Sequence, residues 1–205
     1  MILQEALARH TLEKYPTDFS AHYNLGALLQ LRDKPEEATV QFREALAAKP
    51  DNVTVLNSLG ASLEAQGKLD EAAVPLQRAI ALQPNYVDAR YNLGKLLLAQ
   101  HRAKQAAAQF NIVVAAKPDD AAAREHYIEA LQQAGNLDLA IEQSRELLRL
   151  QPASSGLYNN LGVLFTRKGN MAQAVAQFEQ AVRLDPSDLS ARQNLEHARA
   201  QLARK

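Results

Sequence analysis

The sequence predicts an all-α protein, a solenoid in which pairs of antiparallel helices follow one another along the chain. The first observation behind this prediction is a period of 34 residues that covers nearly the whole sequence. The second is that apolar residues within a period recur at helical spacing, as at Ala38, Phe42, Ala45 and Leu46. A chain that repeats at such a period stacks its units without a single central core.

Four residue types return at fixed positions of the period. The prolines are Pro16, Pro50, Pro84, Pro118, Pro152 and Pro186. The alanines are Ala38, Ala72, Ala106, Ala140 and Ala174. The leucines are Leu25, Leu59, Leu93 and Leu161, with Tyr127 as the exception, and the glycines are Gly26, Gly60, Gly94 and Gly162, with Ile128 as the exception. Small residues at two of these positions let paired helix axes approach closely.

The stretch 155–188 carries the pattern in its fullest form. It places an aromatic, Leu-Gly and an aromatic on one helix, then Ala, Phe and Ala on the next, before the proline. These residues are Tyr158, Leu161, Gly162, Phe165, Ala174, Phe178, Ala181 and Pro186. The spacing resembles the tetratricopeptide repeat, and this resemblance implies a right-handed α-solenoid whose biochemical role is to bind other proteins.

The period divides the single predicted solenoid, residues 1–205, into five full repeats and two partial ones. The full repeats are 19–52, 53–86, 87–120, 121–154 and 155–188, with helices expected at positions 1–14 and 17–30 of each. Residues 1–18 are expected to be the second helix of a partial repeat, either a native cap or, as the apolar start favours, part of a longer solenoid. Residues 189–205 are expected to form a capping helix with Ala191, Leu195, Ala198 and Leu202 facing inward.

Turn and cap residues support these helix limits. We expect helix N-caps at Asp18, Asn52, Asp120, Ser154 and Asp188. Gly67, Gly135 and Gly169 stand where the first helix of a repeat should end, since glycine readily adopts the left-handed conformation required there. Asp33 and His101 replace it in two repeats, where we expect slight strain.

The fourth repeat departs most from the pattern. It has Tyr127 and Ile128 in place of Leu-Gly, Ser144 in place of the aromatic, and Leu147 in place of alanine. We expect a compensated packing that keeps the total side-chain volume. The alternative is a local change of twist, or a weak point of the stack.

Composition excludes several classes of function. Lys+Arg and Asp+Glu both number 23, and a net charge of zero argues against nucleic acid as a partner. No apolar run is long enough to insert into a membrane, and no signal peptide is visible, so we expect a soluble and preferably cytoplasmic protein. The absence of cysteine excludes thiolate chemistry. We also find no catalytic motif and no histidine pair at metal-ligand spacing, so neither an enzyme nor a cofactor is expected. His22 occupies the aromatic position of the first repeat, and we expect it to pack there as an aromatic residue.

The candidate binding residues lie on one face of the first helices, opposite the buried positions. Position 6 holds Asn24, Asn92, Asn160 and Asn194, while Ser58 and His126 interrupt the series. Its neighbours Tyr23, Tyr91, Asn57, Asn159 and Lys95 complete the expected groove, whose charges are mildly acidic. An amide both donates and accepts, so such a face suits a ligand's backbone whatever its sequence.

This asparagine series resembles that of the superhelical tetratricopeptide arrays of O-linked N-acetylglucosamine transferases and kinesin light chains. The resemblance implies that the groove residues hold an extended peptide by its backbone. We therefore expect a non-catalytic scaffold that binds a peptide or protein segment. Two alternatives stay open: a module for self-association or complex assembly through its ends or convex face, and the substrate-recruiting arm of a larger enzyme.

Overall fold

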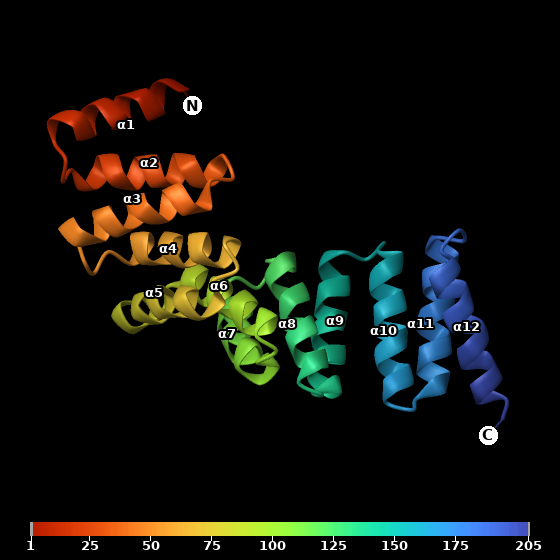
Figure 1. The fold of residues 1–205 in the computed structure, drawn as a ribbon. Coiled ribbons are helices and arrows are strands. Elements are labelled where there is room, and N and C mark those ends of the chain that lie inside the picture. The colour runs from red at the N-terminus through yellow and green to blue at the C-terminus, as the bar shows by residue number, and fades with distance from the viewer. Residues whose placement is uncertain (1, 205) are drawn as a thin grey trace. The chain divides into compact units, whose positions relative to one another are not determined.

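The fold was determined as a computed structural model that describes residues 2–204. Met1 and Lys205, the outer ends of the two expected partial repeats, lie outside the described residues. The described chain forms twelve α-helices and no strand, which confirms the all-α prediction (Figure 1). It divides into two compact units, residues 1–113 and residues 114–205, which are described separately.

The first unit consists of helix pairs stacked in chain order. Its helices are α1 (Ile2–Lys14), α2 (Phe19–Leu31), α3 (Pro35–Ala48), α4 (Val53–Ala65), α5 (Leu69–Leu82), α6 (Val87–Ala99) and most of α7 (Ala103–Ala116). Each helix from α1 to α5 packs against the next. The first helices α2, α4 and α6 also contact one another in that order and form a layer of their own.

The second unit repeats this arrangement. Its helices are α8 (Ala121–Gln133), α9 (Leu137–Leu150), α10 (Ser155–Arg167), α11 (Met171–Leu184) and α12 (Leu189–Leu202). Sequential helices pack together, and α10 also contacts α12. Helices therefore begin where the repeat partition expects them in both units, while the partition into repeats stays a prediction.

Side-chain caps start most of the first helices. The expected caps accept a backbone N–H three residues ahead; these residues are Asp18, Asn52, Asp120, Ser154 and Asp188. Tyr86 occupies the same position before α6 and makes no such bond. The N-cap prediction is thus confirmed at all five residues, and one repeat begins without this stabilisation.

The turns within the helix pairs use left-handed backbone at one fixed position. Gly67, Gly135 and Gly169 have φ values between 73° and 79°. Asp33 and His101 have φ values of 57° and 58° at the equivalent places, in a region that costs a residue with a Cβ atom conformational energy. The expected turn geometry is confirmed in all five pairs.

A glycine on the first helix allows close approach to the second. An added Cβ at Gly26 would lie 2.7 Å from the Phe42 ring, and one at Gly162 would lie 2.5 Å from the Phe178 ring. Both rings are buried, at 0% and 2% exposure. These pairs confirm that a small residue at this position sets the helix separation.

The fourth repeat exchanges the sizes at these two positions. Ile128 stands in place of the glycine and Ser144 in place of the aromatic ring, and both are buried. The Ser144 hydroxyl donates to the Ala140 carbonyl at 2.8 Å, so the small side chain satisfies its polar atom within its own helix. The pair α8–α9 keeps the helix lengths of α10–α11, as a compensated packing requires.

In three repeats, the side chain at position 4 of the first helix links the preceding loop to the second helix by hydrogen bonds. The Arg90 guanidinium donates to the Pro84 carbonyl at 2.7 Å and to Gln109 at 2.8 Å. Arg124 makes the same two contacts with Pro118 and Gln143. The ring nitrogens of His22 lie 2.8 Å from the Pro16 carbonyl and 2.9 Å from Gln41 Oε1. His22 is buried as expected, but it acts as a polar link between a loop and a helix in addition to packing.

The two ends of the described chain differ in character. Ala191, Leu195 and Ala198 of α12 are buried as expected, whereas Leu202 is 41% exposed, so its inward prediction is wrong. It lies in the last turn of α12 and lines an open hollow with residues 168–172 of the α10–α11 turn and the start of α11. At the other end, α1 leaves Leu3 82% and Leu7 65% exposed.

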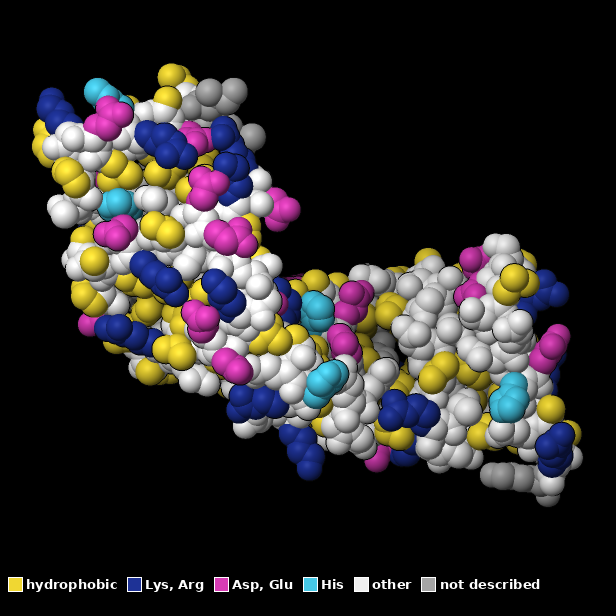
Figure 2. Space-filling view, in the orientation of Figure 1, with side chains coloured by type: hydrophobic (Ala, Val, Ile, Leu, Met, Phe, Trp, Pro, Cys, Tyr) yellow, Lys and Arg dark blue, Asp and Glu magenta, His cyan; other side chains and the backbone are white. Residues whose placement is uncertain are grey.

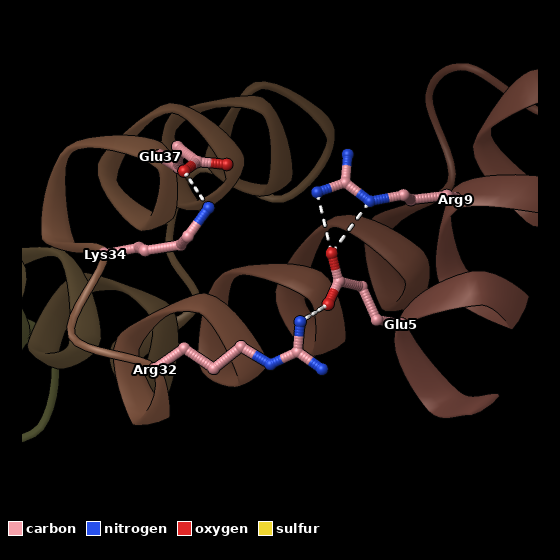
Figure 3. A network of polar contacts seen from close by, with 5 residues as sticks. All are labelled: Glu5, Arg9, Arg32, Lys34 and Glu37. Atoms are coloured by element: carbon pink, nitrogen blue, oxygen red, sulfur yellow. Dashed lines mark hydrogen bonds and ion pairs between the residues drawn. The ribbon is translucent and has the colours of Figure 1, made fainter. Parts of the chain in front are cut away.

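An ion-pair network fastens α1 to the C-terminal end of α2 (Figure 3). The Glu5 carboxylate accepts from Arg9 at 2.8 Å and from Arg32, and Lys34 pairs with Glu37 nearby. The hydrogen bond from Arg9 is the main cause that lowers the pKa of Glu5 below its usual value. The tie compensates in part for the weak apolar pattern of α1.

Candidate functional site

The candidate site consists of positions 5 and 6 of the first helices, which we call the amide face of each unit. Its members in the first unit are Tyr23, Asn24, Asn57, Ser58, Tyr91 and Asn92. Its members in the second unit are Glu125, His126, Asn159, Asn160, Gln193 and Asn194. These side chains project from the layer of first helices because positions 3, 7 and 8, as at Ala21, Leu25 and Gly26, turn into the core.

The asparagines of the amide faces fall into two groups. Asn24 and Asn160 are exposed, and neither side chain makes a hydrogen bond to another described residue. Asn92 and Asn194 are half-buried and bonded to an asparagine of the preceding first helix. The four asparagines of the predicted position 6 series are therefore two free amides and two paired amides.

The two amide pairs have the same geometry. Asn92 Nδ2 donates to Asn57 Oδ1 at 2.9 Å, across α6 and α4. Asn194 Nδ2 donates to Asn159 Oδ1 at 2.9 Å, across α12 and α10. In both pairs, position 5 of one first helix thus faces position 6 of the next first helix, 35 residues further along the chain.

Lys95 contacts two side chains of its own unit. Its ammonium lies 3.3 Å from the Glu64 carboxylate and 5.9 Å from the centre of the Tyr91 ring. Both charged side chains are partly shielded from solvent. This pair joins one acidic and one basic side chain of the first unit, so the net charge expected for the face is unchanged.

Tyr23 and Tyr91 of the amide face pack at the edge of the core of the first unit. The Tyr23 ring stacks on Phe19 at 6.4 Å and contacts Phe42 at 6.2 Å. Tyr91 packs edge-on against Phe110 at 5.9 Å. Such contacts fix the orientation of each ring, and they leave a half-buried side chain at the surface of the face.

Tyr86 belongs to this neighbourhood and was missed by the sequence analysis. It is half-buried, and burial raises the pKa of its phenol, against a hydrogen bond with Thr54 that lowers it. The charges of Asp88 and Tyr23 act on the same phenol. The sequence contained a signal for this residue, because Tyr86 stands at the position where every other repeat places a capping Asp, Asn or Ser.

A hollow of about 440 Å³ lies between α1 and α2 at the free amide of Asn24. Its apolar lining includes Leu7, Ala8, Leu28 and Leu31. Of its polar lining, Thr11 bonds the Leu7 carbonyl, and Asp18 caps α2. The hollow thus joins an apolar floor to an uncharged amide.

The described surface carries mixed charges without a large area of one sign on the face in view (Figure 2). Between residues 2 and 204, no three His, Asp or Glu side chains come together in a way that could hold a metal ion. Nor is any helix of this part of the chain long and apolar enough to cross a bilayer. His126 lies 3.6 Å from Glu129 of its own helix, which is a local surface contact.

Stacked helix pairs with capped first helices and glycine-spaced packing define an α-helical repeat protein. Family models of the TPR repeat match residues 63–101, and models of the tetratricopeptide repeat match 91–155, 128–188 and 7–39. Together these matches cover more than half of the sequence, and the chain belongs to the tetratricopeptide-repeat family. Its broad class is therefore a protein-interaction scaffold.

Solved structures share this fold. YrrB, described as a TPR protein with an unusual peptide-binding site, matches with a TM-score of 0.81 and 22% identity, over 94% of this chain and 97% of that one. MamA from Desulfovibrio magneticus RS-1, from residue 41 to its end, matches with a TM-score of 0.74 and 26% identity, over 83% of this chain and 97% of that one. No curated protein matches the chain in sequence.

Proposed function

We propose that this protein is a non-catalytic scaffold that binds an extended peptide or protein segment along its amide faces. The observation that carries the proposal is the repeated presentation of solvent-facing amides on successive first helices. Asn24 stands beside an apolar hollow, and Asn160 lies free on α10. An uncharged amide suits a backbone N–H or C=O of any sequence, and an adjacent apolar surface suits one side chain.

The relatives support the proposal at the level of the fold. YrrB is described as having a peptide-binding site, and its fold spans nearly the whole of this chain. The net charge of zero favours a peptide over a polyanion, because nucleic-acid binding depends on a basic surface. The matching family models describe repeats, and none of them describes a catalytic domain.

A display selection with random peptides tests the proposal. The wild type and a variant with Asn24, Asn92 and Asn160 all replaced by alanine are screened in parallel. We expect the wild type to enrich peptides that the variant loses, while Tm changes little. The matched control replaces the exposed amides of Gln77 and Gln83, outside the amide faces, by alanine. Equal enrichment by wild type and triple variant would contradict the proposal.

A second candidate function is assembly through the N-terminal end of the first unit. The exposed leucines Leu3, Leu7 and Leu31 favour it, since apolar clusters at a surface mark contact sites. Light scattering over a wide concentration range tests this candidate. A mass that grows with concentration, and that falls back to the monomer in Leu3→Gln/Leu7→Gln, supports assembly, whereas monomer throughout excludes self-assembly.

A further inference from the structure

The residue that follows a first helix reaches back, in four places, to the second helix that precedes it. This residue stands at position 14 of its repeat, and the four are Arg32, Gln66, Gln100 and Lys168. Arg32 donates to the Glu5 carboxylate on α1. Gln66 Nε2 donates to the Thr39 hydroxyl on α3 at 2.7 Å. The contacts with α5 and α9 are equivalent, and their acceptors are Asp70 and Asp138.

Helix α1 depends on this contact more than α3 does, because α1 buries little else. Among the α1 side chains from residue 3 to residue 14, only Ala8 is buried. Ala8 stands where α3 places the fully buried ring of Phe42, 34 residues later. Helix α3 also buries Ala38, Thr39 and Ala45. Buried apolar surface therefore holds α3 in place, whereas α1 has little of it.

The interface between α1 and α2 is not close-packed. The hollow of about 440 Å³ lies between the two helices, and its α1 wall consists of Gln4, Leu7, Ala8 and Thr11. Protein interiors normally contain few voids larger than a water molecule. A helix that meets its neighbour across a hollow, with an ion pair at one end, opens at low cost, because few contacts are broken.

The loop between the two helices is fixed independently of the ion pair. Residues 15–18 join α1 to α2, and the Pro16 carbonyl lies 2.8 Å from a ring nitrogen of His22 on α2. The Asp18 side chain accepts from the Ala21 N–H at 2.7 Å and caps the same helix. The loop therefore keeps its place on α2 when α1 is released, and α1 turns away about this loop.

We propose that α1 is a hinged wall of the hollow, closed by the ion pair between Glu5 and Arg32 and opened when salt screens this pair. The Arg32 side chain is 31% exposed, so dissolved ions reach it. Glu5 lies between Arg32 and Arg9 of its own helix, and the hydrogen bond from Arg9 fixes the orientation of the carboxylate (Figure 3). The open state lacks the α1 wall beside Asn24, so ionic strength sets the fraction of molecules that offer the hollow to a ligand. That consequence rests on the proposed function, whereas the opening of α1 does not.

Hydrogen exchange of the full chain, read by mass spectrometry, tests the hinge. Arg32→Ala removes the ion pair and leaves the sequence of α1 unchanged, and alanine is the natural residue at this position of the fourth repeat, Ala134. We expect the α1 amides of the wild type to exchange about fivefold faster at about 1 M than at about 0.01 M NaCl, because the Debye length falls from about 30 Å to about 3 Å. In Arg32→Ala they should exchange at the faster rate at both salt concentrations.

Lys168→Ala is the matched control in the second unit. It removes the ion pair with Asp138 at the same position of the repeat. Exchange of α9 should change little, because this helix also buries Ala140, Ile141, Ser144 and Leu147. Glu37→Gln is a control for charge near α1, since it breaks the neighbouring pair with Lys34 and leaves the contact between Glu5 and Arg32 in place.

Three results would overturn the hinge: exchange of α1 that does not depend on salt, exchange of α1 in Arg32→Ala equal to that of the wild type, or an equal acceleration of α9 in Lys168→Ala. A display selection at low salt distinguishes this failure from failure of the proposed function. Arg32→Ala should lose the peptides that Asn24→Ala loses and keep those that depend on Asn160. If the wild type enriches no peptide, the proposed function fails, and the exchange rates still decide the hinge.

Discussion

The fourth and fifth repeats solve one packing problem with opposite residues. In the fifth, Gly162 on α10 makes room for the ring of Phe178 on α11, which would lie 2.5 Å from an added Cβ. In the fourth, the first helix carries the large residue, Ile128, and the second carries the small one, Ser144. Both pairs build a first helix of 13 residues and a second of 14.

This difference teaches that a repeat position constrains combined volume more than residue type. Interiors are close-packed, so a large side chain on one helix requires a small one opposite. Ser144 and Phe178 are both buried, at 3% and 2% exposure, although their volumes differ greatly. The repeat therefore tolerates exchange across the helix pair, provided that both members change.

Breaking one half of the exchange gives the largest expected effect. Phe178→Ser should lower the free energy of unfolding by about 4 kcal/mol, because it opens a cavity in the fifth repeat. Gly162→Ile alone should cost about 3 kcal/mol through overpacking. The double variant reproduces the fourth repeat at these two positions and should cost at least about 2 kcal/mol less than the sum of the two. Urea unfolding of the three variants measures this coupling, and additive costs would refute the exchange.

The next largest loss of stability is expected at position 4. Arg124 of the fourth repeat makes hydrogen bonds there, whereas Tyr158 of the fifth makes none to another described residue. Arg124→Leu should cost about 2 kcal/mol, because the Pro118 carbonyl and Gln143 lose a charged donor. Tyr158→Phe, the matched change in the fifth repeat, should cost almost nothing, since its hydroxyl bonds no other described residue. Thermal unfolding of both variants checks the contrast; equal shifts in Tm would show that the tie contributes nothing.

The turns should respond alike in the two repeats. Gly135→Ala and Gly169→Ala should each cost about 1 kcal/mol from backbone strain alone, since φ is 79° and 75° and no atom lies within 4 Å of an added Cβ. Asp33→Gly, at φ 57°, provides the reciprocal test and should stabilise by about 0.5 kcal/mol. Chemical denaturation measures all three, and a stabilising Gly→Ala change would contradict the strain.

The smallest effect appears only at alkaline pH. Burial is the main cause that raises the pKa of Tyr127 above its usual value of 10.0, and the Glu142 carboxylate adds to it. The unfolded chain then loses this proton at lower pH than the folded chain, so the contribution of Tyr127 is complete below pH 10 and is lost as pH rises further. Tyr127→Phe should reduce the loss of stability between about pH 9 and 11. An unchanged pH dependence would show that Tyr127 does not contribute.

Much of the fold could be predicted because its determinants are local. The N-caps, the left-handed turns at Gly67, Gly135 and Gly169, and the close approach at Gly162 each depend on residues a few positions apart or one helix pair apart. The binding residues were harder to assess. Position along a helix placed the asparagines on one face, but it did not distinguish the exposed Asn24 from the paired Asn92.

By itself the sequence determined the 34-residue period, the helix pairs, their caps and the absence of thiol chemistry, because propensity, spacing and composition are properties of the chain. Only the tertiary structure decided which amides bond one another, that Lys95 is neutralised by Glu64, and that Leu202 faces solvent. These outcomes depend on contacts between residues about one repeat apart, or on the packing at the end of a helix, and each requires the relative placement of packed helices.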